Sequence, residues 1–522
     1  MSNSLGKVKE EFFQLMQEEF RRYKEHKQPL DRRIIENNRW FKSRYGEEMT
    51  GEMPTPATPY LFNAIANKHA DAMDNYPSPN VLERRPEDKD LAETLTRILP
   101  LQLDYCRFRK TYSRAWWYKL KNGAACYGVF FNPELRGGIG EIDIRKIDLL
   151  NLFWEPGVTD LQDSRFLFLT ALIDREELRR RYPHCADAFL EDGRVTVETY
   201  DEHGETVTRD KLLVVDCYYK KKQGTHTTVE LAKFCSDTLL DATENHGNSG
   251  LYAHGKYPFV MDVLYPDEDT PVGFGLVDII KNPQCYIDRL DWIISRNAMV
   301  SGKTRYMVKD NGGINEYELT DCSKDIIHVA GSVGEENIRE LQAKPLHSFI
   351  IQHRSNKIEE LKEVVGNRDF QQGGTAGGVT AYSAIVALQQ AGEKLSRDMI
   401  AESYSAFQEI IYLCMELMRQ FYDRPHAYRV DKEKYLSFSN SVWNGDAICH
   451  PLELDVAVSA EKNNPYNRVA QNQTLLELWK LGVFRPDMAE SAQVLLSHMY
   501  FDGKEKLLEQ LEKNLPVDNQ TV

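Results

Sequence analysis

The stretch DIIKNPQCYIDRLDWIISRNAMV, residues 278–300, begins the part of the chain that decides the fold. Its apolar residues recur at helical spacing along one stripe, which contains Ile287, Leu290 and Ile294. Polar residues between them are expected to point away from this stripe, namely Asp288, Asp291 and Ser295. The pattern predicts a helix that packs against other residues on one side only.

The residues after this helix lose the helical period. In SGKTRYMVKDNGGINEYEL, residues 301–319, apolar and basic side chains alternate from Arg305 to Lys309, as in a strand, and an Asn-Gly-Gly turn follows. Helical spacing returns in SFIIQHRSNKIEELKEVV, residues 348–365, and Gly366 suits the left-handed cap at the end of a helix. We therefore expect a small β insertion between two helices.

A glycine-rich segment and a long helix come next. The segment NRDFQQGGTAGGVT, residues 367–380, contains four glycines, which free the backbone from side-chain constraint. Residues 380–422 contain no proline, and their apolar side chains share one helical face. A helix of some forty residues would be about 60 Å long, with Gly392 as a suitable kink point. Such a rod is longer than a compact small domain needs.

This order of elements resembles the portal, or head-to-tail connector, proteins of tailed bacteriophages. In that family two stem helices bracket a clip domain, a tunnel loop follows the second, and a long kinked helix runs into the wing. The resemblance rests on PVGFGLVDIIKNPQCYIDRLDWIISRN (271–297), NRDFQQGGTAGG (367–378) and VTAYSAIVALQQAGEKLSRDM (379–399). More loosely, NLFWEPG (151–157) resembles a wing segment in which an aromatic residue precedes an acidic residue and a proline.

The resemblance implies an α+β chain with the phage portal fold: a mixed α/β wing, two stem helices, a small α/β clip, a long kinked helix and a helical crown. The expected segments are an N-terminal arm and wing at 1–272, stem helix 1 at 273–300, the clip at 301–345, stem helix 2 at 346–366, the tunnel loop at 367–380, the long wing helix at 381–423, wing strands at 424–460, and the helical crown and tail at 461–522.

The same resemblance implies a function. Such a chain would form a ring, twelve subunits in the virion, at one capsid vertex, and the ring would be the channel for double-stranded DNA during packaging and ejection. Its partners would be the terminase large subunit, a head-completion adaptor, and the major capsid and scaffolding proteins, with no membrane and no cofactor. The protein would be made in the bacterial host cytoplasm and located at the portal vertex of the virion.

The resemblance also assigns site residues. The DNA-channel residues of the tunnel loop are expected to be Arg368, Gln371, Gln372, Gly373, Gly374, Thr375, Gly377 and Gly378. The stem residues at the subunit interface are expected to be Ile287, Arg289, Leu290, Trp292, Ile294 and Arg296. Arg289, Trp292, Arg296 and Met299 share one helical face, which would meet either the lumen or a neighbouring subunit. The clip residues that dock terminase or adaptor are expected to be Lys303, Arg305, Tyr306 and Lys309.

Composition limits the other interpretations. A chain of 522 residues that is 42% hydrophobic is expected to form two to four lobes, and no run approaches the roughly 20 apolar residues that span a bilayer. The net charge of −15 argues against tight binding of nucleic acid but suits a conduit through which DNA slides. Nine scattered cysteines without a Cys-x-x-Cys pair predict reduced thiols and no metal site.

Two segments leave alternatives open. The amphipathic stretch of residues 5–27 would dock either on its own domain or on a partner. In YCRFRKTYSRAWWYKLK, residues 105–121, basic and aromatic side chains alternate, as in proteins that bind single-stranded nucleic acid. The favoured interpretation is that the aromatic residues lie in the core and the cations cover its solvent edge.

Known catalytic motifs are absent from the sequence. The segment GGTAGGVT (373–380) lacks the Lys-Ser or Lys-Thr of a phosphate-binding loop, and Asp267, Glu268 and Asp269 lack the further ligands of a calcium loop. The chain is therefore not expected to be an enzyme. The alternatives to a portal are a non-catalytic scaffold or adaptor with a helical rod, and an enzyme without recognisable motifs.

Overall fold

A computed structural model gives the structure of the chain. It describes residues 8, 10–43, 58–189, 195–198, 200, 205–208, 210–224, 226–247, 250–302, 305–308, 338–341, 346–366, 394–430, 435–443, 453–462 and 475–480, with a few isolated residues from 315 to 330 and from 472 to 499. The expected tunnel loop, most of the expected clip and crown, and the first part of the expected long helix lie outside these residues.

The central body is a three-stranded antiparallel sheet covered by helices. Its order is β11 (Phe259–Val263), β2 (Ala124–Asn132) and β3 (Glu141–Ile147). The helices α4 (Phe108–Asn122) and α11 (Lys394–Phe421) pack against β2. Residues Ala124 to Val129 of β2 are all buried, which is why this strand reads as a continuous apolar run.

A five-stranded antiparallel sheet forms the second lobe. Its order is β10 (Thr238–Ala242), β9 (His226–Cys235), β8 (Lys211–Gln223), β5 (Phe166–Asp174) and β4 (Leu152–Phe153). Because side chains alternate along a strand, Val215, Cys217 and Tyr219 of β8 join one buried cluster, while Tyr218 joins the core of the central body. The helix α6 (Arg175–Arg181) follows β5.

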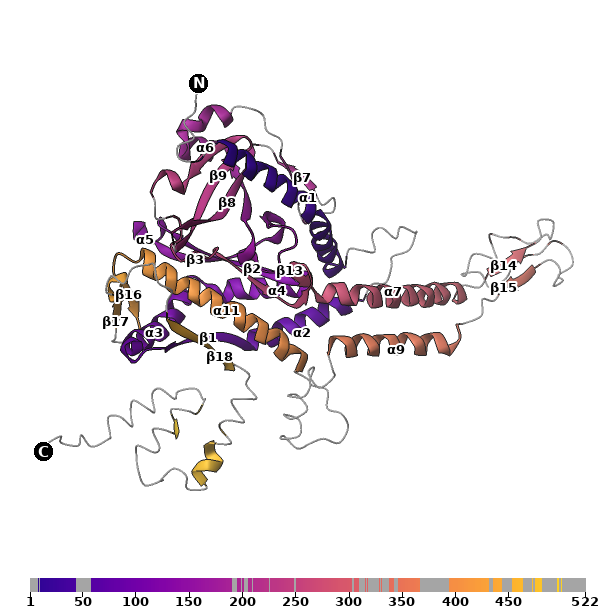
Figure 1. Ribbon diagram of the computed structural model, residues 1–522. Helices are drawn as coiled ribbons and strands as arrows, with labels where there is room; N and C mark the ends of the chain where they lie inside the picture. Colours follow the sequence, from indigo (N-terminus) through magenta and orange to yellow (C-terminus); the bar gives the residue numbers. More distant parts are fainter. Residues whose placement is uncertain are drawn as a thin grey trace.

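The N-terminal helix α1 (Glu10–Phe41) covers this second sheet (Figure 1). Its Phe13, Met16 and Tyr23 are buried in one cluster with Phe168 and Phe234. Of the two alternatives for the amphipathic N-terminal stretch, the structure selects docking on the chain's own domain. The helix is longer than the amphipathic stretch of residues 5–27 and continues through Pro29 to Phe41.

Within the described residues, three further helices and four further antiparallel strand pairs complete this part of the structure. The helices α2 (Tyr60–Asp74) and α3 (Lys89–Tyr105) precede α4, and α5 (Leu135–Gly138) lies between β2 and β3. β1 (Asn75–Glu83) pairs with β18 (Leu454–Lys462) over its whole length, from Asn75 opposite Lys462 to Glu83 opposite Leu454. The remaining antiparallel pairs are β6 (Val195–Glu198) with β7 (Glu205–Thr208), β12 (Tyr265–Asp267) with β13 (Thr270–Phe274), and β16 (His426–Arg429) with β17 (Tyr435–Phe438).

Two helices project from this body. Figure 1 shows α7 (Leu276–Ser301) and α9 (Ser348–Val365) side by side, with β14 (Arg305–Val308) and β15 (Ile338–Leu341) beyond their far ends. The chain is thus an α+β protein with a helical hairpin that extends away from its sheets. No helix within the described ranges has the length and apolarity needed to cross a membrane.

Candidate assembly surface on the projecting helices

The start of α7 is fixed to the body by close backbone contacts. Gly273 and Gly275 precede the helix, and an added Cβ at either position would collide with backbone oxygens, that of Tyr265 for Gly273 and that of Lys121 for Gly275. The Gly275 N–H donates to the Asp278 carboxylate (2.9 Å), which places an acidic group at the helix N-terminus. These glycines therefore serve close packing of the chain on itself.

Polar contacts join the two projecting helices. Arg354 of α9 binds both carboxylate oxygens of Asp291 of α7, at 3.1 Å for Nη2 to Oδ2. This contact raises the pKa of the Arg354 guanidinium above its usual value. Gln284 Nε2 donates to Asp288 Oδ1 (2.9 Å) and to the carbonyl oxygen of Thr58 (2.9 Å). The prediction that Asp288 and Asp291 point away from the packed side was wrong, because both are buried between α7 and its neighbours.

The apolar stripe of α7 is largely covered by its own chain. Ile287 is completely buried, Leu290 is buried, and Ile294 is half-buried. Leu361 and Val365 of α9 join Ile287 in the main core cluster. Ile287 and Leu290 therefore leave almost no surface for a neighbouring subunit.

A second face of α7 stays exposed. Arg289, Trp292, Arg296 and Met299 are all exposed, and the Arg296 guanidinium lies 5.0 Å from the centroid of the Trp292 ring. Other large apolar side chains of the two helices are also exposed, namely Tyr286, Ile293, Phe349, Ile351 and Val364. So many exposed apolar groups on one hairpin are typical of a surface that binds another protein.

Most of the other expected site residues lie outside the described part of the chain. All of the tunnel-loop residues from Arg368 to Gly378 lie outside the described residues, as do Lys303 and Lys309. Arg305 and Tyr306 lie in β14, opposite Leu341 and Glu340 of β15, but only their backbone is described.

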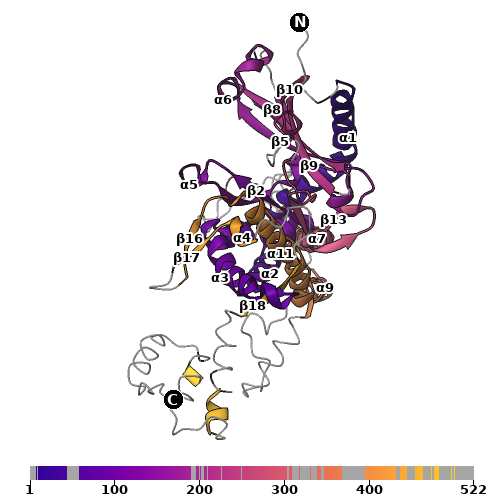
Figure 2. The ribbon, with the colours of Figure 1, turned by 60° about the vertical axis from the view of Figure 1, so that its left-hand side comes forward.

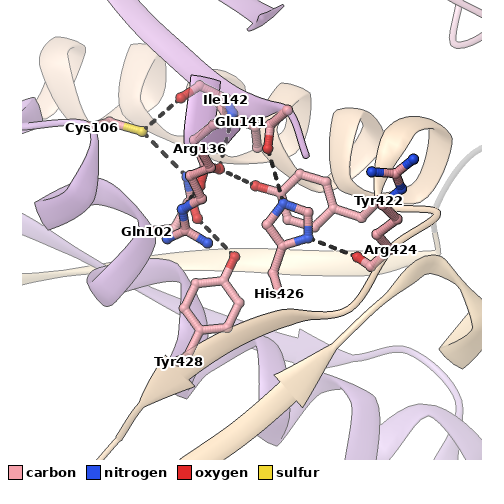
Figure 3. A network of polar contacts seen from close by, with 10 residues as sticks. Gln102, Cys106, Arg136, Glu141, Ile142, Tyr422, Arg424, His426 and Tyr428 are labelled. Atoms are coloured by element: carbon pink, nitrogen blue, oxygen red, sulfur yellow. Dashed lines mark hydrogen bonds and ion pairs between the residues drawn. The ribbon is translucent and has the colours of Figure 1, made fainter. Parts of the chain in front are cut away.

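The end of α11 is held by a buried polar network (Figure 3). Glu141 Oε1 accepts hydrogen bonds from Gln102 Nε2 (2.7 Å) and from the Tyr422 hydroxyl (2.5 Å), and Glu141 Oε2 forms an ion pair with Arg136 (2.8 Å). The Tyr428 hydroxyl donates to Gln102 Oε1 (2.8 Å). Sequence gave no signal for this network, because its members come from segments up to 326 residues apart.

This network has a structural role. Burial raises the pKa of the Cys106 thiol to about 12, so this sulfur remains protonated and donates to the carbonyl oxygen of Ile142 (3.0 Å). Burial also raises the pKa values of Tyr422 and Tyr428 above their ordinary range. The His426 ring stacks on Tyr422, with centroids 3.8 Å apart. The network therefore positions the segment after α11 and offers no nucleophile.

A buried lysine joins α4 to α11. Lys119 Nζ donates to Asp262 Oδ1 (2.6 Å) and Ser403 Oγ (2.8 Å), and to the carbonyl oxygen of Met399 (3.3 Å). Burial lowers the pKa of Lys119, and Asp262 opposes that shift. The expectation that the cations of residues 105–121 cover the solvent edge fails for Lys119, which is completely buried.

The aromatic residues of the same run lie mainly in the core. Phe108, Tyr112 and Trp116 are buried, which excludes them from stacking on exposed bases. Within the described residues, no cluster of His, Cys, Asp and Glu side chains is arranged to hold a metal ion.

The chain matches the sequence model of a known protein family. The sequence model for the phage P22-like portal protein matches residues 63–258 and 291–521, which is most of the chain. A search of curated proteins found no significant match. The family match confirms the resemblance to portal proteins of tailed phages. The chain therefore belongs to the phage P22-like portal protein family.

Proposed function

We propose that this chain assembles into a closed ring, a dodecamer in the virion, at one vertex of a phage capsid. The observation that carries the proposal is the projecting hairpin of α7 and α9, which leaves Trp292, Ile293, Met299, Phe349 and Ile351 exposed. A heterologous contact repeated around a closed ring would cover these groups on every subunit. The family match supports this role.

The ring would surround the channel for double-stranded DNA in packaging and ejection. In this proposal Trp292 and Arg296 lie at the subunit interface or on the channel wall, and the tunnel loop, with Arg368 and Gln371, contacts DNA. A net charge of −15 suits such a channel, because a strand that slides needs weak contact with phosphates.

The remaining roles follow the segment boundaries inferred from the sequence. The clip, residues 301–345, would dock the terminase large subunit and then the head-completion adaptor. The capsid and scaffolding proteins would contact the ring at the vertex. The protein would be made in the bacterial cytoplasm and then become part of the virion. We assign it no catalytic activity, in keeping with a family whose members are generally structural.

Imaging of the purified protein by negative-stain electron microscopy, combined with mass measurement, tests the ring. We expect particles with a central hole and a mass near twelve chains. A stable monomer or dimer at high protein concentration, with or without scaffolding protein, would contradict the proposal. Such a result would favour a scaffold or an enzyme.

A second experiment tests the tunnel loop. Deletion of residues 373–378 should leave rings intact and impair packaging or retention of DNA, because it removes the glycines that let the loop adjust to the DNA. Normal packaging by this variant would refute the role of the loop without affecting the ring.

A further inference from the structure

The solvent side of α4 carries a stripe of cations. Arg107, Lys110, Arg114 and Lys121 follow one another at helical spacing and share one face, which extends about 20 Å at 1.5 Å per residue. The first three are exposed, and Lys121 is half-buried.

Two further lysines extend this basic stripe. Lys146 of β3 lies over the ring of Tyr118, with Nζ 3.9 Å from its centroid, and so fills the gap between Arg114 and Lys121. Lys42 follows the end of α1. Burial, Lys146 and Lys42 together lower the pKa of Lys121 to about 8. Burial is the main cause of this shift, and the two lysines add to it because like charges disfavour the charged form of Lys121.

Within the described residues, few carboxylates neutralise the basic stripe. Asp148 lies 3.8 Å from Lys146 Nζ, but its carboxylate also accepts hydrogen bonds from the hydroxyls of Tyr118 and Tyr200. No described carboxylate forms an ion pair with Arg107, Lys110, Arg114 or Lys121, nor with Lys42. In a chain with a net charge of −15, such a stripe favours an acidic partner.

The same chain carries an acidic projection. The tip of the hairpin between β12 and β13 consists of Asp267, Glu268 and Asp269, which are all exposed. Within the described part of the chain, no lysine or arginine forms an ion pair with them. Asp269 has a φ of 61°, which is the left-handed turn that closes the hairpin.

The acidic tip lies at one end of β13, and the other end of β13 lies against the end of α4, where an added Cβ at Gly123 would be 2.4 Å from the carbonyl oxygen of Gly273. α4 and β13 overlap in Figure 1, but in Figure 2 α4 lies to the left of α11 and β13 to its right. Away from this contact, the two elements are therefore displaced along the line of sight of Figure 1. The hairpin of α7 and α9 runs across that view, so copies arranged along the line of sight would place their projecting hairpins side by side.

We propose that the acidic tip at Asp267–Asp269 of one subunit docks on the basic stripe of α4 in the next subunit of the ring. The inference rests on the proposed ring and names one of its contacts. A second copy of the chain is the favoured occupant because the chain itself carries both an exposed basic stripe and an exposed acidic tip, which are complementary in charge, and a heterologous contact repeated between copies can close a ring. The contact would set register between neighbours and depend on salt concentration.

Charge exchange tests this contact. One variant combines Lys110→Glu with Arg114→Glu, a second combines Asp267→Lys with Glu268→Lys, and a third carries all four changes. We expect each double variant to weaken the association of subunits by about tenfold or more, and the fourfold variant to recover most of the loss. Sedimentation and native mass spectrometry at several salt concentrations measure the fraction of chain in rings.

The controls separate this contact from folding and from the ring itself. The matched control is Lys24→Glu with Lys222→Glu, which reverses two exposed charges outside the basic stripe and should form rings like the wild type. Circular dichroism checks that every variant is folded. If the wild type forms rings and both double variants form them equally well at every salt concentration, the proposed contact is wrong while the ring stands.

A second outcome would also overturn the inference. If Lys110→Glu with Arg114→Glu leaves ring stability unchanged but abolishes binding of a short double-stranded DNA in a gel-shift assay, the basic stripe binds phosphates rather than a neighbouring subunit.

Discussion

Removal of the buried Lys119 ammonium should destabilise the subunit strongly. In Lys119→Met the carboxylate of Asp262, which is 1% exposed, loses its cation and retains the hydrogen bonds from the Ser403 hydroxyl, at 2.8 and 3.0 Å. Loss of one partner from a buried ion pair costs about 3–5 kcal/mol. Because Ser403 still donates to Asp262, we expect about 3 kcal/mol, a large share of the usual stability of a domain.

A compensating variant isolates the cause of this loss. In Lys119→Met combined with Asp262→Leu no charge remains buried, and the Ser403 hydroxyl is free to donate to the carbonyl oxygen of Met399, one helical turn earlier. Replacement of both partners of a buried ion pair by apolar groups is often nearly neutral. We therefore expect the double variant to regain most of the stability that the single variant loses.

Denaturant unfolding followed by tryptophan fluorescence and circular dichroism measures both effects. Trp116 is a local reporter, because its ring lies 4.6 Å from Lys119 Nζ. The matched control is Lys24→Met, an exposed lysine of α1 whose replacement should change stability by less than about 0.5 kcal/mol. The reasoning is refuted if Lys119→Met costs less than about 1 kcal/mol, or if the double variant is as unstable as the single variant.

Three further predictions concern ring assembly, stability at low pH and a close backbone contact. Trp292 is 39% exposed, so an interface that covers it gains roughly 2 kcal/mol from its apolar area. Trp292→Ala should therefore weaken ring assembly, as measured by sedimentation. Unchanged assembly would place this side chain outside the interface. Burial and neighbouring cations lower the pKa of His254 from 6.5 to about 4. As pH falls, the His254 imidazole therefore takes up a proton at a higher pH in the unfolded chain than in the folded chain. The free energy of unfolding should fall by up to about 3 kcal/mol between pH 6.5 and 4, and by less in His254→Gln. Equal pH profiles of stability for the wild type and His254→Gln would contradict this. Gly123 has a φ of 94°, and an added Cβ would lie 2.4 Å from the carbonyl oxygen of Gly273, whereas Gly157, with a φ of 83°, has open space there. Gly123→Ala should cost at least about 3 kcal/mol and Gly157→Ala about 1 kcal/mol in denaturant unfolding, and similar losses would show that the close contact is unimportant.

Local patterns predicted the elements that depend on neighbours in sequence. The helical spacing of residues 348–365 predicted the helix that forms α9, and the apolar positions of residues 278–300 predicted α7. The order of these elements was sufficient to suggest the portal family, which the family match confirms. Such predictions succeed because the side-chain period of a helix or a strand is fixed by backbone geometry.

Periodicity did not predict which charged groups are buried. Asp291 and Lys119 occupy positions that periodicity assigns to solvent, yet they are buried against Arg354 and Asp262. Burial of a charge is unfavourable unless a partner is present, and both partners come from distant parts of the chain. The basic stripe was likewise only partly visible in the sequence, because Lys146 and Lys42 reach α4 only in the folded chain.

The sequence by itself thus determined the two projecting helices, the α+β class and the family, since these depend on local periodicity and on the order of elements. Only the tertiary structure decided which charges are buried, which apolar groups of the projecting hairpin remain exposed, and which charged groups face outward together. The physical reason is that solvation and Coulomb energies depend on distances between residues that are remote in sequence, and folding alone sets those distances.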